Sequence, residues 1–428
     1  MSSTPAVRER LTPDQRNAFT GAFLGWTMDA FDYFIVVLVY AEVGKDLGVS
    51  LTTMALLTTA TLVMRPVGAL VFGLWADRVG RRTPLVVDVL FYSVVGFLCA
   101  FAPNFTVLFV LRLLYGIGMG GEWGLGAALA MEKVPASRRG FFSGVLQQGY
   151  STGYLLAAVA YYLIDPHLGW RGMFAVSIVP GLLALFVRTR VRESAAWEQT
   201  RERVALTRTT PGQVFRNPLV LRRFVYLVLL MTAFNWMSHG TQDVYPTFLK
   251  EGLGFSADSA IGIAVIYNVG AIIGGTLLGA ASQRIGRRWT IVGCSLLGLP
   301  VLYLFTQSTT FGMIALGSFL MQFLVQGAWG VIPAHLTELS PDEIRGFYPG
   351  VTYQLGNLFA SLNLYLQEDI AAGHGYPAAL VWTLVPVLLC VAGLAAVGTE
   401  RRGAVFGAGA GAAAVDVRGS GASSPDRG

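Results

Sequence analysis

The chain has 428 residues, of which 54% are hydrophobic and only 13% are Asp, Glu, Lys or Arg, and its formal net charge is +6. Soluble proteins usually carry about twice that share of charged residues. Together with a mean hydropathy of +0.56, this composition argues against a water-soluble enzyme and against a disordered chain. It predicts a protein whose solvent is the lipid bilayer.

Apolar runs long enough to cross a bilayer, about 20 residues each, follow one another along the chain. Residues 1–17 are polar, and the run after them contains Asp29 and Asp32 and is too long for a cleavable signal peptide, so we expect a retained helix. The predicted spans are residues 20–41, 52–75, 84–103, 106–132, 141–164, 170–190, 221–249, 258–282, 288–306, 309–337, 347–370 and 377–398. We therefore predict an all-α integral membrane protein with twelve transmembrane helices.

Basic residues gather in alternate connections between these spans. Arg78, Arg81 and Arg82 follow the second span, and the longest connection, residues 191–220, holds several more arginines. The positive-inside rule then places both termini and this long connection in the cytoplasm. Because topology accounts for the charge of +6, the charge gives no support to nucleic-acid binding.

An internal repeat divides the chain. Residues 73–82 recur as residues 279–288, an offset of 206, and the segments 132–144 and 121–124 recur at the same offset. This predicts two six-helix bundles in parallel orientation, residues 18–190 and 221–400, joined by a cytoplasmic linker of residues 191–220. Residues 401–428 are rich in Gly, Ala and Ser, and we expect this tail to be disordered.

The loop motif G-x-x-x-D-R-x-G-R-R at residues 73–82, its degenerate copy and the two-part repeat resemble the major facilitator superfamily over residues 18–400. The resemblance implies a substrate site near the midplane between the bundles, exposed to each side in turn by rocking. It also implies a cytoplasmic gate latched by Asp77, Arg78 and Arg82; Gln283 replaces the acid in the second copy, which predicts a weaker latch there. The remaining residues assigned to the gate are Glu132, which we expect to contact the Arg139 region, and Arg139, Arg284, Glu338 and Arg345.

Four charged residues lie inside predicted spans of the first half: Asp29, Asp32, Arg65 and Arg112. A charge at the bilayer centre costs at least about 2.5 to 3.5 kcal/mol, so each needs a reason. Asp29 and Arg65 lie at similar depth, about 13 and 10 Å from the cytoplasmic end at 1.5 Å per residue, and Asp32 and Arg112 are matched nearer the outer side. Two acid and base pairs are thus predicted. They either pack helices only, or release an arginine for a substrate carboxylate when the acid is protonated.

The seventh span carries a polar stripe. Asn235, Ser238, His239, Gln242 and Asp243 are spaced as one continuous helical face, which cannot face lipid. We expect it to line a central cavity, with His239 able to carry a proton or donate to an anion.

A closer resemblance rests on this stripe. The pattern N-x-x-S-H-x-x-Q-D-x-x-x-T from Asn235 to Thr247 resembles the signature of the Jen-type lactate and pyruvate permeases, within the sialate and lactate proton symporter group. The run Asp-Ala-Phe-Asp at residues 29–32 is similar to a motif of aromatic-acid proton symporters. The residues that these resemblances implicate in substrate binding are Arg65, Asn235, His239, Gln242 and Gln354. Those expected to serve proton coupling are Asp29, Asp32, Arg112, Asp243 and Glu122, although Glu122 suits helix packing equally well.

The function implied is import of a small monocarboxylate such as lactate or pyruvate together with a proton, by a monomer in the plasma membrane. The alternatives are a proton symporter for sialic acid, a dicarboxylate or an aromatic acid, and a non-transporting solute sensor. No nucleophile and base pair suggests an enzyme. The three cysteines lie in separate spans without metal-ligand spacing, so neither a disulfide, a metal nor a cofactor is predicted.

Overall fold

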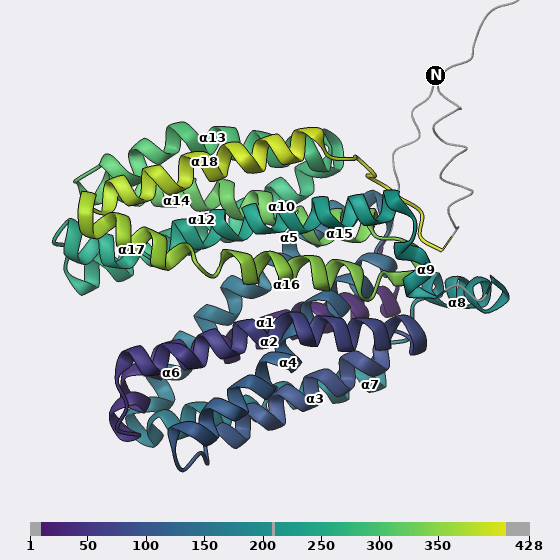
Figure 1. The fold of residues 1–428 in the computed structure, drawn as a ribbon, viewed down its shortest axis with the longest axis horizontal. Helices are drawn as coiled ribbons and strands as arrows, with labels where there is room; N and C mark the ends of the chain where they lie inside the picture. The colour runs from purple at the N-terminus through teal and green to yellow at the C-terminus, as the bar shows by residue number, and fades with distance from the viewer. Residues whose placement is uncertain (1–9, 208–209, 408–428) are drawn as a thin grey trace, which may run out of the picture.

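The computed structural model describes residues 10–207 and 210–407, and within these ranges the ordered elements are helices only. The long helices run side by side in two groups (Figure 1). The first group comprises α1 (Pro13–Asp46), α2 (Leu51–Val79), α3 (Arg82–Cys99), α4 (Phe105–Lys133), α6 (Gly149–Ala175) and α7 (Pro180–Arg190). The second comprises α10 (Pro218–Gln242), α12 (Ala257–Ile285), α13 (Arg287–Gln307), α14 (Phe311–Trp329), α16 (Tyr348–Ala360), α17 (Asn363–His374) and α18 (Tyr376–Val397). The predicted all-α architecture of two helix bundles is confirmed.

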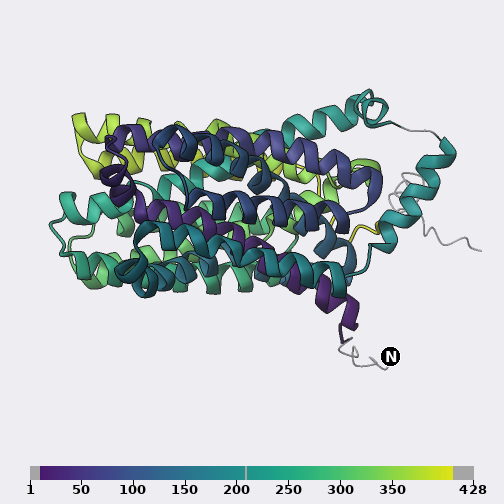
Figure 2. The ribbon, with the colours of Figure 1, turned by 90° about the horizontal axis from the view of Figure 1, so that it is seen from below.

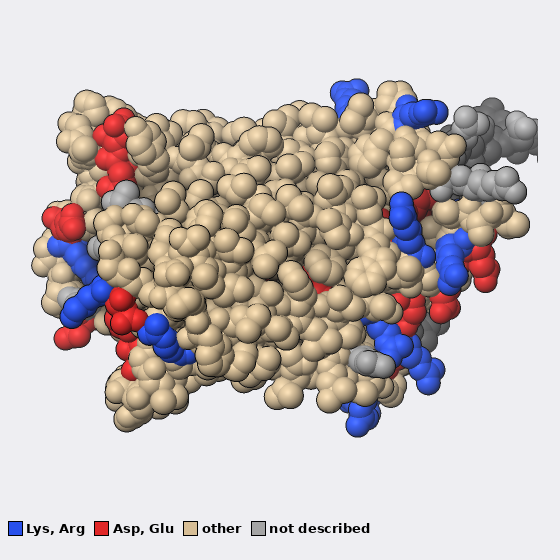
Figure 3. Space-filling model, turned by 60° about the horizontal axis from the view of Figure 1, so that its bottom comes forward, with Lys and Arg blue, Asp and Glu red and all other residues tan. Residues whose placement is uncertain are grey.

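The surface of the molecule matches a membrane setting. Figure 3 shows acidic and basic side chains gathered mainly at the two ends, with a broad uncharged belt between them. Large apolar side chains are exposed on the outer helices, for example Leu163 at 59% and Leu182 at 70%. Ten helical stretches among the described residues are long and apolar enough to cross a bilayer. The protein is therefore a multi-pass integral membrane protein.

The count of twelve spans stays a prediction, for two structural reasons. Residues 136–187 form one apolar stretch of 52 residues, in which α6 continues to Ala175 through a kink at Gly169 (φ 58°) instead of ending near residue 164. The predicted span 347–370 is broken between α16 and α17, of 13 and 12 residues, and neither piece alone is long enough to cross.

Other predicted boundaries also moved. Helix α1 starts at Pro13, before the predicted residue 20, because the Thr12 side chain and Gln15 form a capping box. The predicted spans 221–249 and 309–337 are each interrupted: α10 is followed by α11 (Tyr245–Thr247) and η3 (Phe248–Gly252), and α14 is followed by α15 (Ile332–Leu339). Pro246 and Pro333 start the second pieces, where a missing N–H is tolerated.

The two halves share local geometry at the repeat offset. Gly80 and Gly286, 206 residues apart, both end a helix with positive φ, 104° and 107°. The arginine after each glycine forms a buried ion pair: Arg81 with Glu132 at 3.2 Å and Arg287 with Glu338 at 3.1 Å. Both partners are again separated by the same offset, so the sequence repeat is a repeat of structure.

Two segments expected to be irregular contain structure. The predicted linker, residues 191–220, holds α8 (Ala195–Thr207) and α9 (Pro211–Phe215), which lie at the end of the molecule where α1 begins (Figures 1 and 2). The tail predicted to be disordered from residue 401 is described as far as Gly407, because polar contacts hold residues 402–407 against the helices. Residues 408–428 lie outside the described part of the chain.

Candidate functional site

A cavity lies between the two helix groups. It comprises about 510 Å³ of space, part of it open to solvent. Its walls come from α1, α2, α6 and the short helix α5 (Arg139–Gln147) on one side and from α10, α14 and α16 on the other. The lining side chains are Trp26, Tyr33, Leu62, Arg65, Gln147, Tyr150, Asn235, Ser238, His239, Gln242, Gln326, Trp329, Tyr353 and Asn357.

Arg65 is the cationic group of this cavity. Close packing of α4 fixes the backbone of α2 at this level, since a Cβ on Gly120 would lie 1.9 Å from the carbonyl oxygen of Arg65. The Arg65 side chain is 6% exposed, and its Nη2 lies 3.9 Å from Oδ2 of Asp29, which is too far for a hydrogen bond. Nε and Nη2 of Arg65 and both carboxylate oxygens of Asp29 are buried without a hydrogen-bond partner. The guanidinium therefore retains donors that an anion could take.

The opposite wall is the polar stripe of α10. Asn235, Ser238, His239 and Gln242 all line the cavity, as the helical spacing predicts. His239 Nδ1 lies 3.1 Å from Asp243 Oδ2, and its Nε2 lies 3.2 Å from Asn357 Oδ1. With oxygen on both sides, the ring makes both hydrogen bonds when it carries two protons. Asp243 thus joins the site through the imidazole and is not itself part of the cavity wall.

The aromatic cluster formed by Trp26, Trp123, Trp329 and Tyr353 brings together both halves. Tyr353 stacks on Trp123 with ring centroids 4.4 Å apart and meets Trp26 and Trp329 edge-on at 6.4 and 5.8 Å. The Trp123 N–H donates to Gln147 Oε1 at 3.4 Å. The indole nitrogens of Trp26 and Trp329 are buried without a partner, so this cluster also carries unused donors.

The structure places Gln354 away from the cavity wall. On α16 the lining residues are Tyr353 and Asn357, four apart on one face, and Gln354 points about 100° away from Tyr353. Its amide nitrogen and oxygen are both buried without partners. Tyr353, Asn357, Trp26 and the other cavity aromatics were not predicted as site residues, although the repeated Trp123 and Trp329 offered a signal.

The buried acids of the first group have fewer partners than predicted. Asp32 and Arg112 are buried but, within the described residues, form no ion pair within 4.0 Å. Instead, the Arg112 guanidinium lies 3.9 Å above the Tyr115 ring. Glu122 faces α1, since a Cβ on Gly25 would lie 2.2 Å from Glu122 Oε1. Asp88 on α3 was missed, although a charge within a predicted span was a signal; it is also fully buried.

The gate residues gather at the end that carries the basic connections. Asp77 accepts hydrogen bonds from the backbone N–H groups of Gly346 (2.7 Å) and Phe347 (3.1 Å) in the other half. At the equivalent position, Gln283 accepts from the N–H of Gly140 at 3.0 Å and donates to the carbonyl of Ala136 at 2.9 Å. The second copy therefore keeps the contact across the halves but lacks the charge.

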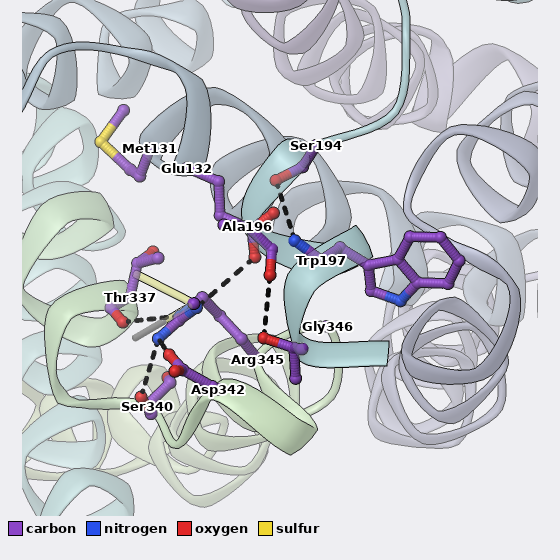
Figure 4. A network of polar contacts seen from close by, with 12 residues as sticks. Met131, Glu132, Ser194, Ala196, Trp197, Thr337, Ser340, Asp342, Arg345 and Gly346 are labelled. Atoms are coloured by element: carbon purple, nitrogen blue, oxygen red, sulfur yellow. Dashed lines mark hydrogen bonds and ion pairs between the residues drawn. The ribbon is translucent and has the colours of Figure 1, made fainter. Parts of the chain in front are cut away.

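The expected contact of Glu132 with the Arg139 region is wrong. Glu132 lies between Arg81 at 3.2 Å and Arg345 at 3.8 Å, whereas Arg139 reaches across to Glu338 at 3.1 Å. Figure 4 shows Arg345 directed at Glu132, Thr337, Ser340 and Asp342. Each glutamate is thus paired with the arginine of its own half and with the repeat-related arginine of the other half.

The remaining predicted gate residues are more peripheral. The side chains of Arg78 and Arg284 are exposed, and the backbone N–H of Arg82 donates to the Glu193 carboxylate at 3.1 Å. The buried cations at this position are Arg81 and Arg287, 1% and 0% exposed, which were not among the predicted site residues. Their neighbours in the repeated motif gave no reason to prefer them.

Comparison with known proteins places this architecture. The model of the family described as Major Facilitator Superfamily matches residues 22–265, more than half of the chain, and that of the family described as Sugar (and other) transporter matches residues 224–398. The chain belongs to the major facilitator superfamily. The structural likeness agrees: the proton:xylose symporter XylE superposes with a TM-score of 0.76 at 20% identity, covering 92% of this chain and 98% of that one.

Two curated members of the major facilitator superfamily are similar in sequence. A protein named carboxylic acid transporter protein homolog, from Saccharomyces cerevisiae, is 29% identical over 395 residues, which cover 86% of this chain and 63% of the yeast protein. The sialic acid transporter NanX of Escherichia coli is 28% identical over 354 residues, covering 81% of this chain and 85% of NanX. The chain spans about 63% of the yeast relative's length.

In a major facilitator protein the two halves rock about a central site. Here the hydrogen bonds and ion pairs between the halves gather at the gate end. The cavity residue His239 and its partner Asp243 retain side-chain exposures of 28% and 30%. The arrangement therefore matches a state closed at the gate end, with the central cavity reached from the other end.

Proposed function

We propose that this protein imports a small monocarboxylate together with a proton, with lactate and pyruvate as the leading candidates. The observation that carries the proposal is Arg65, a guanidinium with unpartnered donors in a cavity between the halves. Guanidinium binds carboxylate through two parallel hydrogen bonds. The named activity of the yeast relative supports the same class of substrate.

In this proposal the two walls have separate tasks. Arg65 holds the carboxylate, while Asn235, His239 and Gln242 bind its remaining oxygens; Gln354 would first have to turn toward the cavity. Asp29, Asp32 and Asp243 are the candidate proton carriers, with Arg112 and Glu122 adjusting the charge around them. Protonation of Asp29 would remove the anion that competes for Arg65, and so couples the proton to the substrate.

Uptake is expected to depend on the pH gradient and to be independent of voltage. One anion moving with one proton carries no net charge, so the membrane potential, about 2.3 kcal/mol per charge per 100 mV, contributes nothing. The pH gradient contributes about 1.4 kcal/mol per unit. Radiolabelled lactate uptake into proteoliposomes, measured after a pH step and again under a valinomycin clamp, tests this. Strong voltage dependence at constant pH would contradict one-to-one coupling.

The aromatic cluster supplies a second test of the substrate site. Trp329→Phe keeps the ring but removes an unpartnered N–H at the cavity, and we expect lactate affinity to fall about tenfold if that N–H donates to the bound carboxylate. The matched control is Trp236→Phe, because the Trp236 N–H already donates to the carbonyl of Phe359 at 3.2 Å outside the cavity lining. Equal affinities for the two variants, measured by equilibrium binding of labelled lactate, would remove Trp329 from the site.

A sialic acid symporter is the second candidate, favoured by the similarity to NanX. Both substrates present a carboxylate to Arg65 but differ greatly in size. Competition of unlabelled lactate, pyruvate and sialic acid against labelled lactate separates them. Inhibition by sialic acid at lower concentrations than lactate would reverse our order of preference.

A further inference from the structure

The C-terminal segment that follows α18 crosses the closed gate. Arg402 Nη1 donates to the carbonyl of Arg284 at 2.6 Å, and the N–H of Gly403 donates to Glu338 Oε1 at 3.2 Å. The carbonyl of Ala404 accepts from Arg139 Nη1 at 3.0 Å. The same glutamate and arginine form the ion pair between the halves, so the segment is bonded to both sides of the gate.

Phe406 lies at the centre of this contact. Its ring has the Arg139 guanidinium 4.0 Å from one centroid position and the Arg345 guanidinium 4.1 Å away, both within the range of a cation–π interaction. These two arginines are repeat partners, 206 residues apart, and both are 3% exposed. One aromatic ring therefore joins equivalent positions of the two halves.

The end of the segment is bonded to the connection between the halves. The carbonyl of Gly407 accepts from Arg203 Nη1 of α8 at 3.0 Å. Arg203 also lies 3.4 Å from Asp342 and 3.5 Å from Glu343 of the second half. Gly407 packs against α8 so closely that a Cβ on it would lie 2.6 Å from Gln199 Oε1. Residues 403–407 thus touch the first half, the second half and the linker together.

We propose that residues 403–407 form a clasp that holds the gate end closed and must be released before it opens. Opening separates Arg139 from Arg345, so Phe406 cannot keep both guanidinium contacts. The hydrogen bonds of Gly403 and Ala404 connect the same two halves and are subject to the same separation. The clasp therefore favours the state with the cavity open at the other end, and a change in this segment alters the balance between the two states.

The test measures the gate directly, without any substrate. Spin labels on Ser137→Cys and Arg222→Cys, both exposed positions on opposite halves, report the separation of the gate ends by double electron–electron resonance, with the exposed Cys390 replaced by Ser. Phe406→Ala in the full chain is expected to raise the ratio of open to closed distances about tenfold, equivalent to ~1.4 kcal/mol. Deletion from Gly403 onward is expected to raise it at least as much.

The matched control is Val405→Ala, because Val405 is 78% exposed in the same segment. Its distance distribution is expected to equal that of the unchanged chain. If Phe406→Ala and the deletion also leave the distribution unchanged, the segment is not a clasp. Since no carboxylate is present, this outcome is independent of whether lactate is the substrate.

Discussion

Replacing Arg65 with Gln is expected to lower carboxylate uptake by at least about a hundredfold. Hydrogen bonds to charged groups contribute about 1.5 to 3 kcal/mol each, and the variant loses two of them with the carboxylate. It also leaves Asp29, which is fully buried, without the nearest cation. The measurement is the initial rate of labelled lactate uptake into proteoliposomes at an inward proton gradient.

Arg171→Gln is the matched control for this variant. Arg171 is 47% exposed and pairs with Asp46 at the outer surface, so its loss is expected to leave uptake within about twofold, as for an exposed ion pair. Arg65→Lys adds a second comparison, because Lys keeps the charge but not the planar fork, and we expect an intermediate rate. Wild-type uptake by a folded, monodisperse Arg65→Gln protein would remove Arg65 from the substrate site.

The sequence was sufficient for the fold class and for one wall of the cavity. Apolar runs report the membrane helices because lipid requires them to be apolar, and the repeat at one register requires two similar halves. The stripe on α10 was predictable because its polar residues share one face of a single helix. Asn235 and His239 therefore reached the cavity as expected.

Features that depend on contacts between helices were not predictable in the same way. The rotation of α16 about its axis decides that Tyr353 faces the cavity and Gln354 does not. Depth matching alone paired Asp32 with Arg112, but Tyr115 occupies the face of that guanidinium. Partner choice at the gate failed for the same reason, since Glu132 and Arg139 are close in sequence but point to different arginine and glutamate partners.

Replacing Glu338 with Gln is expected to destabilise the protein by about 3 to 5 kcal/mol, the range for breaking a buried ion pair by removing one partner. Glu338 is 1% exposed and accepts from Arg139 Nη1 at 3.1 Å, Arg287 Nε at 3.1 Å and Arg287 Nη2 at 3.2 Å. A neutral amide leaves both buried guanidinium groups without their counter-charge. The measurement is the thermal unfolding midpoint in detergent, which we expect to fall by several degrees.

Glu343→Gln provides the control, because Glu343 has a 28% exposed side chain and lies 3.5 Å from Arg203, where an ion pair contributes about 0 to 1 kcal/mol. Its unfolding midpoint is expected to stay near that of the unchanged chain. Because Glu338 joins the two halves through Arg139 and also binds the N–H of Gly403, its replacement should weaken the closed gate as well as the fold. Equal midpoints for the two variants would show that the buried pairs at the gate contribute no more than the exposed one.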